Sequence, residues 1–138
     1  MVFGKKDPNE ERFNAQMHVR HFVNVVLYAL CVVVLLYFLR FIVFRNNYIM
    51  ALIATIIFTV HPIHTEVVAN VKSRDEVMSL MFICLTFIYS FRYLDQKDKK
   101  WQWAGLTCYL LAFLSKEYAI SLMALLPLSF YIFRRMSI

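Results

Sequence analysis

Long apolar runs separated by short charged segments dominate the chain. Five runs contain no Asp, Glu, Lys or Arg and are mainly hydrophobic: 22–39, 46–65, 77–91, 101–115 and 118–133. They are too long for buried strands, which usually span about 4–8 residues. Residues 31–39 and 49–60 show no polar face at helical spacing, although a helix on the surface of a soluble protein needs one. The pattern therefore predicts an all-α protein whose helices lie in a membrane.

The length of each run decides how easily it can span a bilayer. A spanning helix needs about 20 mainly apolar residues, with a range of roughly 17–25. Only the first two runs reach this length unaided. The shorter ones can be extended, because Arg92 can direct its charge to the interface and Trp101 and Trp103 can anchor there. We predict a single domain over 1–138, a polytopic membrane helical bundle of about five transmembrane helices. A polar N-terminal outer segment covers 1–20, and the helices cover about 21–44, 47–61, 75–94, 101–115 and 118–134.

Composition and charge support this interpretation. Hydrophobic residues make up 61% of the chain and charged residues 17%, below the roughly 25% usual in soluble domains. Cys31, Cys84 and Cys108 all lie within apolar runs, where cysteine packs as a small apolar side chain, so we expect no disulfide. The net charge of +6 does not indicate nucleic-acid binding, because the basic residues are scattered through loops without a recognisable binding fold.

Polar groups are distributed unequally between the two sides that alternating helices would create. Basic residues number eight on one side and seven on the other, so the positive-inside rule does not fix the orientation. All four histidines and seven of the nine carboxylates fall on the side of the N-terminal segment. We therefore expect any chemistry on that face. These residues are His18, His21, His61, His64, Asp7, Glu10, Glu11, Glu66, Asp75, Glu76 and Glu117.

The segment 61–76 carries the densest set of reactive side chains and reads HPIHTEVVANVKSRDE. Pro62 disfavours helix at the preceding residue, so the second helix should end there. Ser73 and Glu76 fit a capping box before the next apolar run. Glu66 stands in apolar surroundings, and a desolvated carboxylate has a raised pKa unless a cation pairs with it. Glu66 therefore suits a general base, or a salt-bridge partner for Lys72 or Arg74.

Two further pairs of residues allow more than one interpretation. His61 and His64 lack the spacing that places two imidazoles on one helical face for zinc. They suit hydrogen bonding to a phosphate or a sugar hydroxyl, or an ordinary loop. Lys116 and Glu117 lie between two apolar runs, where charges are costly without partners. They form either a hairpin turn at the membrane surface or a site in which Lys116 binds an anion such as a lipid phosphate.

Three stretches carry a family resemblance. The segment 61–76 resembles the hallmark stretch of the transmembrane and tetratricopeptide-repeat O-mannosyltransferase family and its bacterial relatives. Residues 114–117 (LSKE) look like the second recurring motif of that family, and 21–30 (HFVNVVLYAL) are similar to the helix before the first. The resemblance covers roughly residues 18–133. It implies a partial membrane domain of the GT-C type, in a multi-pass protein of the bacterial inner membrane or the endoplasmic reticulum.

The resemblance also implies a function and a site. Such enzymes transfer a sugar, here mannose-like, from a polyprenyl-phosphate donor to a protein or glycan acceptor on the outer or lumenal face. By this similarity Glu66 is the acidic catalytic residue. No cofactor is expected, and the sequence does not indicate a divalent metal. The implied substrate-binding residues are His61, His64, Lys72, Arg74, Asp75, Lys116 and Glu117.

The chain also departs from the family pattern. Family members have an earlier helix with an acidic outer loop, further membrane helices and usually a tetratricopeptide-repeat region, none of which is recognisable here. We therefore expect an internal fragment that is inactive alone. The alternative is a small non-catalytic membrane protein with a structural or assembly role. Transport is disfavoured, because the ionisable groups lie at helix ends rather than in mid-membrane, where only Asn24 is strongly polar.

Overall fold

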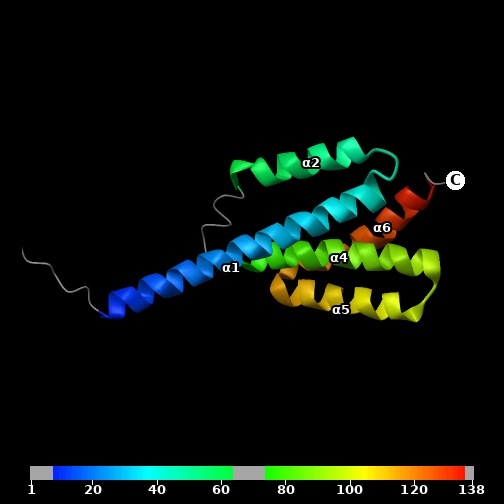
Figure 1. Cartoon of the computed structure of the whole chain (residues 1–138). Coiled ribbons are helices and arrows are strands. Elements are labelled where there is room, and N and C mark those ends of the chain that lie inside the picture. The colour runs from blue at the N-terminus through cyan, green and yellow to red at the C-terminus, as the bar shows by residue number, and fades with distance from the viewer. Residues whose placement is uncertain (1–7, 64–73, 136–138) are drawn as a thin grey trace, which may run out of the picture.

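A computed structural model describes residues 8–63 and 74–135 of the chain. All the regular elements within these ranges are helices, which confirms the prediction of an all-α protein (Figure 1). They are α1 (Pro8–Phe38), the π-helical η1 (Leu39–Val43), α2 (Tyr48–Val60), α4 (Arg74–Gln96), α5 (Lys99–Ser115), the 3₁₀-helical η3 (Glu117–Ser121) and α6 (Leu122–Arg135).

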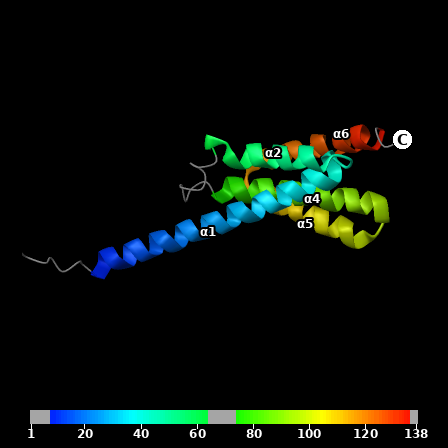
Figure 2. The same cartoon turned by 45° about the horizontal axis from the view of Figure 1, so that its top comes forward.

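The long helices form a bundle in which successive helices run in opposite directions. α4 packs most extensively against α5, contacts α1 along its other side and also touches α6. α2 folds back beside α1 (Figures 1 and 2). The first turns of α1 extend well beyond the other helices in both views. Because the chain reverses at each connection, the start of α4 and the end of α5 meet at one end of the bundle.

α1 begins earlier than the apolar pattern suggests. The apolar run starts at Phe22, but the helix starts at Pro8. Proline suits the first helical position, because its fixed φ is helical and its missing N–H would have no partner there. The predicted start near residue 21 therefore marks where the helix becomes apolar, not where it begins.

Local capping explains the ends of the shorter helices. The Asn47 side chain accepts a hydrogen bond from the Met50 N–H at the start of α2, at 3.3 Å. The Asp98 side chain does the same for the Lys100 N–H at the start of α5, at 3.1 Å. α2 ends at Val60, and His61 has an extended backbone before Pro62, as the proline predicts.

Two apolar clusters hold the bundle together. In the first, Ile42 of η1 meets Ile88 and Phe91 of α4. The second lies where α5, η3 and α6 join. This second cluster consists of Ala112, Ala119 and Leu122, with Phe82, Ile83, Phe87 and Tyr109 packed against it. Away from the clusters, α5 also approaches α4 at Gly105, where an added Cβ would lie 3.5 Å from the Ser90 Oγ, in ordinary van der Waals contact.

Much apolar surface remains outside these clusters. Leu114 is 79% exposed and Met123 75%, and α1 and α2 also carry exposed Val, Ile and Phe side chains. Water-soluble proteins rarely expose apolar patches of this extent, whereas lipid covers them at no cost. The outer surface of the bundle therefore suits a membrane.

Two of the described helices have the length and composition to cross a bilayer. They cover Gln16–Val43, with 28 residues, and Arg74–Gln96, with 23 residues. α2 and Ala119–Ile132 are apolar but shorter. A membrane association is therefore supported by two helices, and the prediction of about five spanning helices stays a prediction.

Candidate functional site

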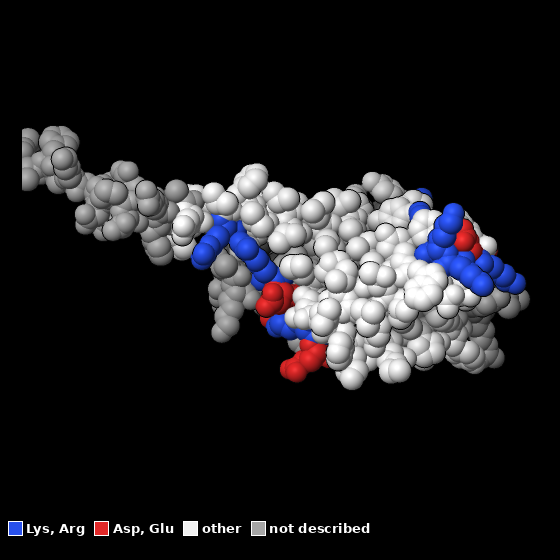
Figure 3. Space-filling view, turned by 90° about the horizontal axis from the view of Figure 1, so that it is seen from below, with Lys and Arg blue, Asp and Glu red and all other residues white. Residues whose placement is uncertain are grey.

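Charged side chains gather at two separate places on the bundle, with an uncharged band between them (Figure 3). One group lies at the start of α4 and the end of α5, and we call it the motif end: Arg74, Asp75, Glu76, Lys116 and Glu117. The other surrounds the α1–α2 and α4–α5 connections, and we call it the basic end: Arg40, Arg45, Arg92, Lys97, Lys99 and Lys100. Apart from His61 at the end of α2, the predicted site residues that the structure describes lie at the motif end.

Arg74 joins α4 to α1. Its Nε donates a hydrogen bond to the Asn24 side-chain oxygen, and its Nη2 donates to the Arg20 carbonyl oxygen at 2.9 Å. Asn24 is only 4% exposed, so this bond places a cation beside a buried amide within an apolar helix. Such a polar group needs a partner in the membrane. The sequence singled out Asn24 as unusually polar, but it did not reveal which residue would meet it.

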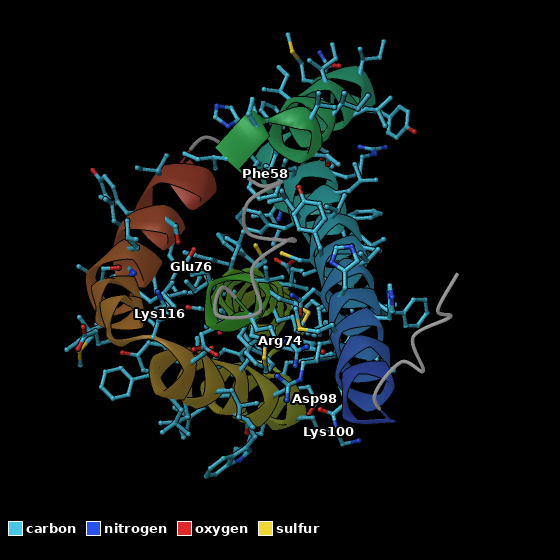
Figure 4. All side chains as sticks on the ribbon, turned by 90° about the vertical axis from the view of Figure 1, so that its left-hand side faces the viewer. Phe58, Arg74, Glu76, Asp98, Lys100 and Lys116 are labelled. Atoms are coloured by element: carbon cyan, nitrogen blue, oxygen red, sulfur yellow. The ribbon has the colours of Figure 1, made fainter. Side chains whose placement is uncertain are left out.

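Lys116 joins the end of α5 to the start of α4. Its Nζ lies 2.9 Å from the Glu76 Oε1 (Figure 4). The Ser115 hydroxyl, next to Lys116 in the chain, donates to the Asp75 carbonyl oxygen at 3.0 Å. The sequence assigned Glu76 to a capping box with Ser73, which lies outside the described residues. The capping box therefore stays a prediction, and the carboxylate of Glu76 contacts Lys116, which lies 40 residues further along the chain.

A small cleft opens beside Glu76, between α1, α2 and α4. Its volume is about 140 Å³, and its walls are mainly apolar. Tyr28 also ties two of these helices together, since its hydroxyl donates to the Thr59 carbonyl oxygen at 3.2 Å. The cleft was not predicted, because an apolar sequence run does not show which faces of which helices will be neighbours. The lining residues are Tyr28, Cys31, Phe58, Ile63, Glu76, Val77 and Leu80.

The remaining predicted site residues divide into two sets. His61 is exposed at the end of α2, where its Nδ1 accepts a hydrogen bond from the Ile63 N–H at 3.3 Å. Asp75 and Glu117 are exposed in the first turns of α4 and η3, where carboxylates are favoured by the helix dipole. The predicted catalytic residue, Glu66, lies outside the described residues, and so do His64 and Lys72.

Metal binding is not tested by this arrangement. Within 8–63 and 74–135, no three His, Cys, Asp or Glu side chains gather as a metal site would require. His64 and Glu66, two of the three residues in the H-x-x-H-x-E pattern, lie outside those ranges. The expectation of no cofactor therefore stays a prediction.

Sequence comparison identifies relatives of this helical chain. The chain is 40% identical to the human protein O-mannosyl-transferase TMTC1 over 76 residues, which is 55% of this chain and 8% of the relative. It is 30% identical to the human protein O-mannosyl-transferase TMTC3 over 109 residues, which is 76% of this chain and 12% of the relative. The mouse protein O-mannosyl-transferase TMTC4 is 34% identical over 83 residues. No family model and no solved structure matches.

These similarities show the class of protein to which the chain is related: glycosyltransferases that act on proteins. More particularly, it is a relative of the TMTC protein O-mannosyl-transferases, which confirms the resemblance seen in the sequence. The similarity to bacterial members stays a prediction. The chain spans about one-tenth of the length of the curated relatives it matches.

Proposed function

We propose that this chain takes part in transferring a mannose-like sugar from a polyprenyl-phosphate donor to a protein or glycan acceptor at the outer or lumenal face of a membrane. The observation that carries the proposal is the sequence similarity to relatives named as protein O-mannosyl-transferases. The arrangement of the motif end supports it in two ways, which concern the donor phosphate and the donor tail; the role of Glu66 is proposed from the sequence alone.

The basic side chains of the motif end suit a lipid phosphate. Lys116 contacts Glu76 and keeps 29% of its side chain exposed, so this basic residue lies at the surface of the bundle. The Nη1 group of Arg74 makes no hydrogen bond to the residues that the structure describes, since Nε and Nη2 carry the bonds to α1. A guanidinium has five donors, and it can hold a phosphate with those that remain.

The cleft beside Glu76 suits the apolar part of the same donor. A polyprenyl phosphate has a charged head and a long hydrocarbon tail, and it lies with the head at the membrane surface. The cleft has mainly apolar walls and opens beside charged groups at one end of the bundle. In this proposal the first isoprene units lie along α1 and α4, and the phosphate faces Lys116.

Glu66 is the proposed catalytic residue, and His61 and His64 shape the sugar pocket. The acceptor hydroxyl attacks the anomeric carbon of the sugar, the bond from that carbon to the phosphate oxygen breaks, and Glu66 accepts the hydroxyl proton. Asp75 and Glu117 would hydrogen-bond sugar hydroxyls. General-base assistance of this kind typically contributes about 10²–10⁴-fold in rate.

A chimera tests this role of Glu66. The matching segment of human TMTC1 is replaced by that of this chain, and transfer of radiolabelled mannose from polyprenyl-phosphate mannose to membrane proteins is measured. We expect transfer by the chimera, and a loss of at least about a hundredfold in Glu66→Gln. Asp95→Asn is the matched control, because it removes a carboxylate from the opposite end of α4. An inserted chimera that is inactive, or an active Glu66→Gln chimera, contradicts the proposal.

A non-catalytic assembly protein is the second candidate. It is favoured by one observation: Arg74 and Lys116, two of the proposed ligands of the phosphate, both make contacts between helices. Under this alternative their role is to fix the bundle, and the exposed apolar faces bind partner helices. It predicts that the bundle needs Arg74 for stability, while Glu66→Gln leaves every measured property unchanged.

A further inference from the structure

The positive charge of the chain is concentrated at the basic end. Its six basic residues are accompanied by two carboxylates, Asp95 and Asp98, which leaves an excess of four positive charges. At the motif end, the described cations Arg74, Lys116 and the neighbouring Arg20 equal in number the described carboxylates, which are Asp75, Glu76 and Glu117. The whole chain carries +6, and the described residues place most of this excess on one end of the bundle.

The two carboxylates at the basic end do not neutralise its cations. Asp98 uses its side-chain oxygen to cap α5, by accepting from the Lys100 N–H at 3.1 Å. Among the residues that the structure describes, no Asp or Glu forms an ion pair with Arg40, Arg45, Arg92 or the three lysines; the ion pair at 2.9 Å belongs to the motif end. Lys97, Lys99 and Lys100 are exposed, so their charges face the surroundings.

Aromatic side chains surround these cations. The Arg92 guanidinium lies over the Trp101 ring, 4.9 Å from its centroid, and donates to the Tyr37 hydroxyl at 2.6 Å. Arg40 lies 5.6 Å from the centroid of the Tyr48 ring. Trp101 and Trp103 are the two tryptophans of the chain, and Trp103 is 67% exposed. Tryptophan and tyrosine concentrate at the level of lipid headgroups, so this end has the composition of a membrane interface.

We propose that the basic end binds the headgroups of anionic phospholipids. Lys97, Lys99 and Lys100 contact the lipid phosphates, and Trp101 and Trp103 lie in the interfacial layer beneath them. A membrane is favoured over a soluble anion, because the charged surface adjoins the exposed apolar faces of α1 and α2. Juxtamembrane basic clusters attract anionic lipids, which are concentrated in the cytoplasmic leaflet. The inference is independent of the proposed transferase function.

The tryptophans themselves provide the test. The full chain is reconstituted in bilayers of phosphatidylcholine and phosphatidylglycerol, one of which is brominated on its acyl chains, and tryptophan fluorescence is recorded. Bromine quenches tryptophan at short range, so relative quenching reports which lipid occupies the basic end. We expect phosphatidylglycerol to be preferred by about fivefold or more at low salt, and less at high salt as the charges are screened. Equal quenching by the two brominated lipids overturns the proposal.

Variants assign the preference to the three lysines. The variant Lys97→Asn/Lys99→Gln/Lys100→Gln removes three charges. Asn is used at position 97 because the backbone of Lys97 is left-handed, with a φ of 54°, and Asn tolerates this conformation. We expect this variant to lose the preference, while Lys99→Arg/Lys100→Arg keeps it. Circular dichroism checks that helix content is retained. The matched control is Lys5→Gln/Lys6→Gln/Arg12→Gln, which removes the same charge near the chain start. A preference that survives the first variant, or that disappears in the control, contradicts the assignment.

A final experiment distinguishes binding of lipid headgroups from binding of free phosphate. Inorganic phosphate is added to the wild-type chain and compared with sodium chloride at the same ionic strength. If the surface recognises lipid headgroups at the bilayer, the two salts reduce the preference equally. If phosphate abolishes the preference where chloride does not, the site binds a free anion and the proposal of a lipid-binding surface is wrong.

Discussion

The two membrane sides predicted from the sequence carry similar numbers of basic residues, but the described residues at the two ends of the bundle use their cations differently. At the motif end each described cation meets a carboxylate, an amide or a carbonyl oxygen of another helix. At the basic end the cations lie over aromatic rings or extend outward. Among the described residues, the motif end is balanced in charge once the neighbouring Arg20 is counted, and the basic end has a positive excess. The difference lies in both the number of basic residues and the number of carboxylates beside them.

An arginine connects α4 to α1 at both ends, and this allows a direct comparison. Arg74 hydrogen-bonds the buried Asn24 side chain and a backbone carbonyl. Arg92 hydrogen-bonds the Tyr37 hydroxyl and lies over two aromatic rings. Arg74 makes two hydrogen bonds, one of them to a buried side chain, whereas Arg92 makes one, to a half-buried hydroxyl. A hydrogen bond from a charged donor contributes more than a contact between a cation and a ring. The motif end should therefore contribute more to the stability of the α1–α4 contact.

Arg74→Ala should have the largest effect. It removes both hydrogen bonds and leaves the buried Asn24 without this donor, so we expect the free energy of unfolding to fall by about 3 kcal/mol. Unfolding of the full chain in detergent micelles, followed by circular dichroism, measures the change. The control is Arg45→Ala, because the Arg45 Nε bonds only to the Phe41 carbonyl one turn away, at 3.2 Å. Equal losses in the two variants would show that Arg74 does not join the helices.

Arg92→Ala should have a smaller effect. It removes the bond to Tyr37 and the contact with Trp101, and we expect a loss of about 1–2 kcal/mol. The emission of Trp101 should also change, because its ring loses the guanidinium that lies 4.9 Å away. Trp103→Phe in the same background leaves Trp101 as the sole reporter. A loss that exceeds that of Arg74→Ala would reverse the comparison of the two ends.

The Glu76–Lys116 ion pair should contribute least to stability among the three contacts compared. Their side chains are 48% and 29% exposed, so solvent screens the interaction and we expect a coupling energy of about 0.5 kcal/mol. A double-mutant cycle with Glu76→Gln and Lys116→Gln measures it. The control cycle uses Asp95 and Lys99, which form no ion pair in the described structure. A coupling above about 2 kcal/mol would mean that the pair is desolvated in the membrane, contrary to this account.

The sequence predicted that the chain is helical better than it predicted which helix faces contact one another. Long uncharged runs predicted helices, because only a helix satisfies its own backbone inside a bilayer. Pro62 predicted the end of α2, since proline excludes helix at His61. The early start of α1 was missed because Pro8–Arg20 is polar, so an apolar pattern does not register it. The buried faces could not be predicted either, because a helix that is apolar all round gives no periodicity from which to choose a face.

The candidate site was predictable only as a group of residues at one membrane surface. That Arg74, Asp75, Glu76, Lys116 and Glu117 lie together follows from alternating helices, and the structure brings them together. Their partners did not follow, because Arg74 and Asn24 are 50 positions apart and meet only when α1 packs on α4. The roles proposed for Glu66, His64 and Lys72 remain predictions from sequence, since these residues lie outside the described ranges.

We predict that the two charged ends lie on opposite sides of a membrane, and labelling of single cysteines would decide this claim. Cys31, Cys84 and Cys108 are replaced by alanine, and either Lys99 or Glu117, at opposite ends of α5, is changed to cysteine. Each full-length variant is labelled with a membrane-impermeant maleimide in sealed microsomes. We predict that position 99 is labelled directly and position 117 only after the membrane is permeabilised. Labelling of both positions from the same side would contradict the claim.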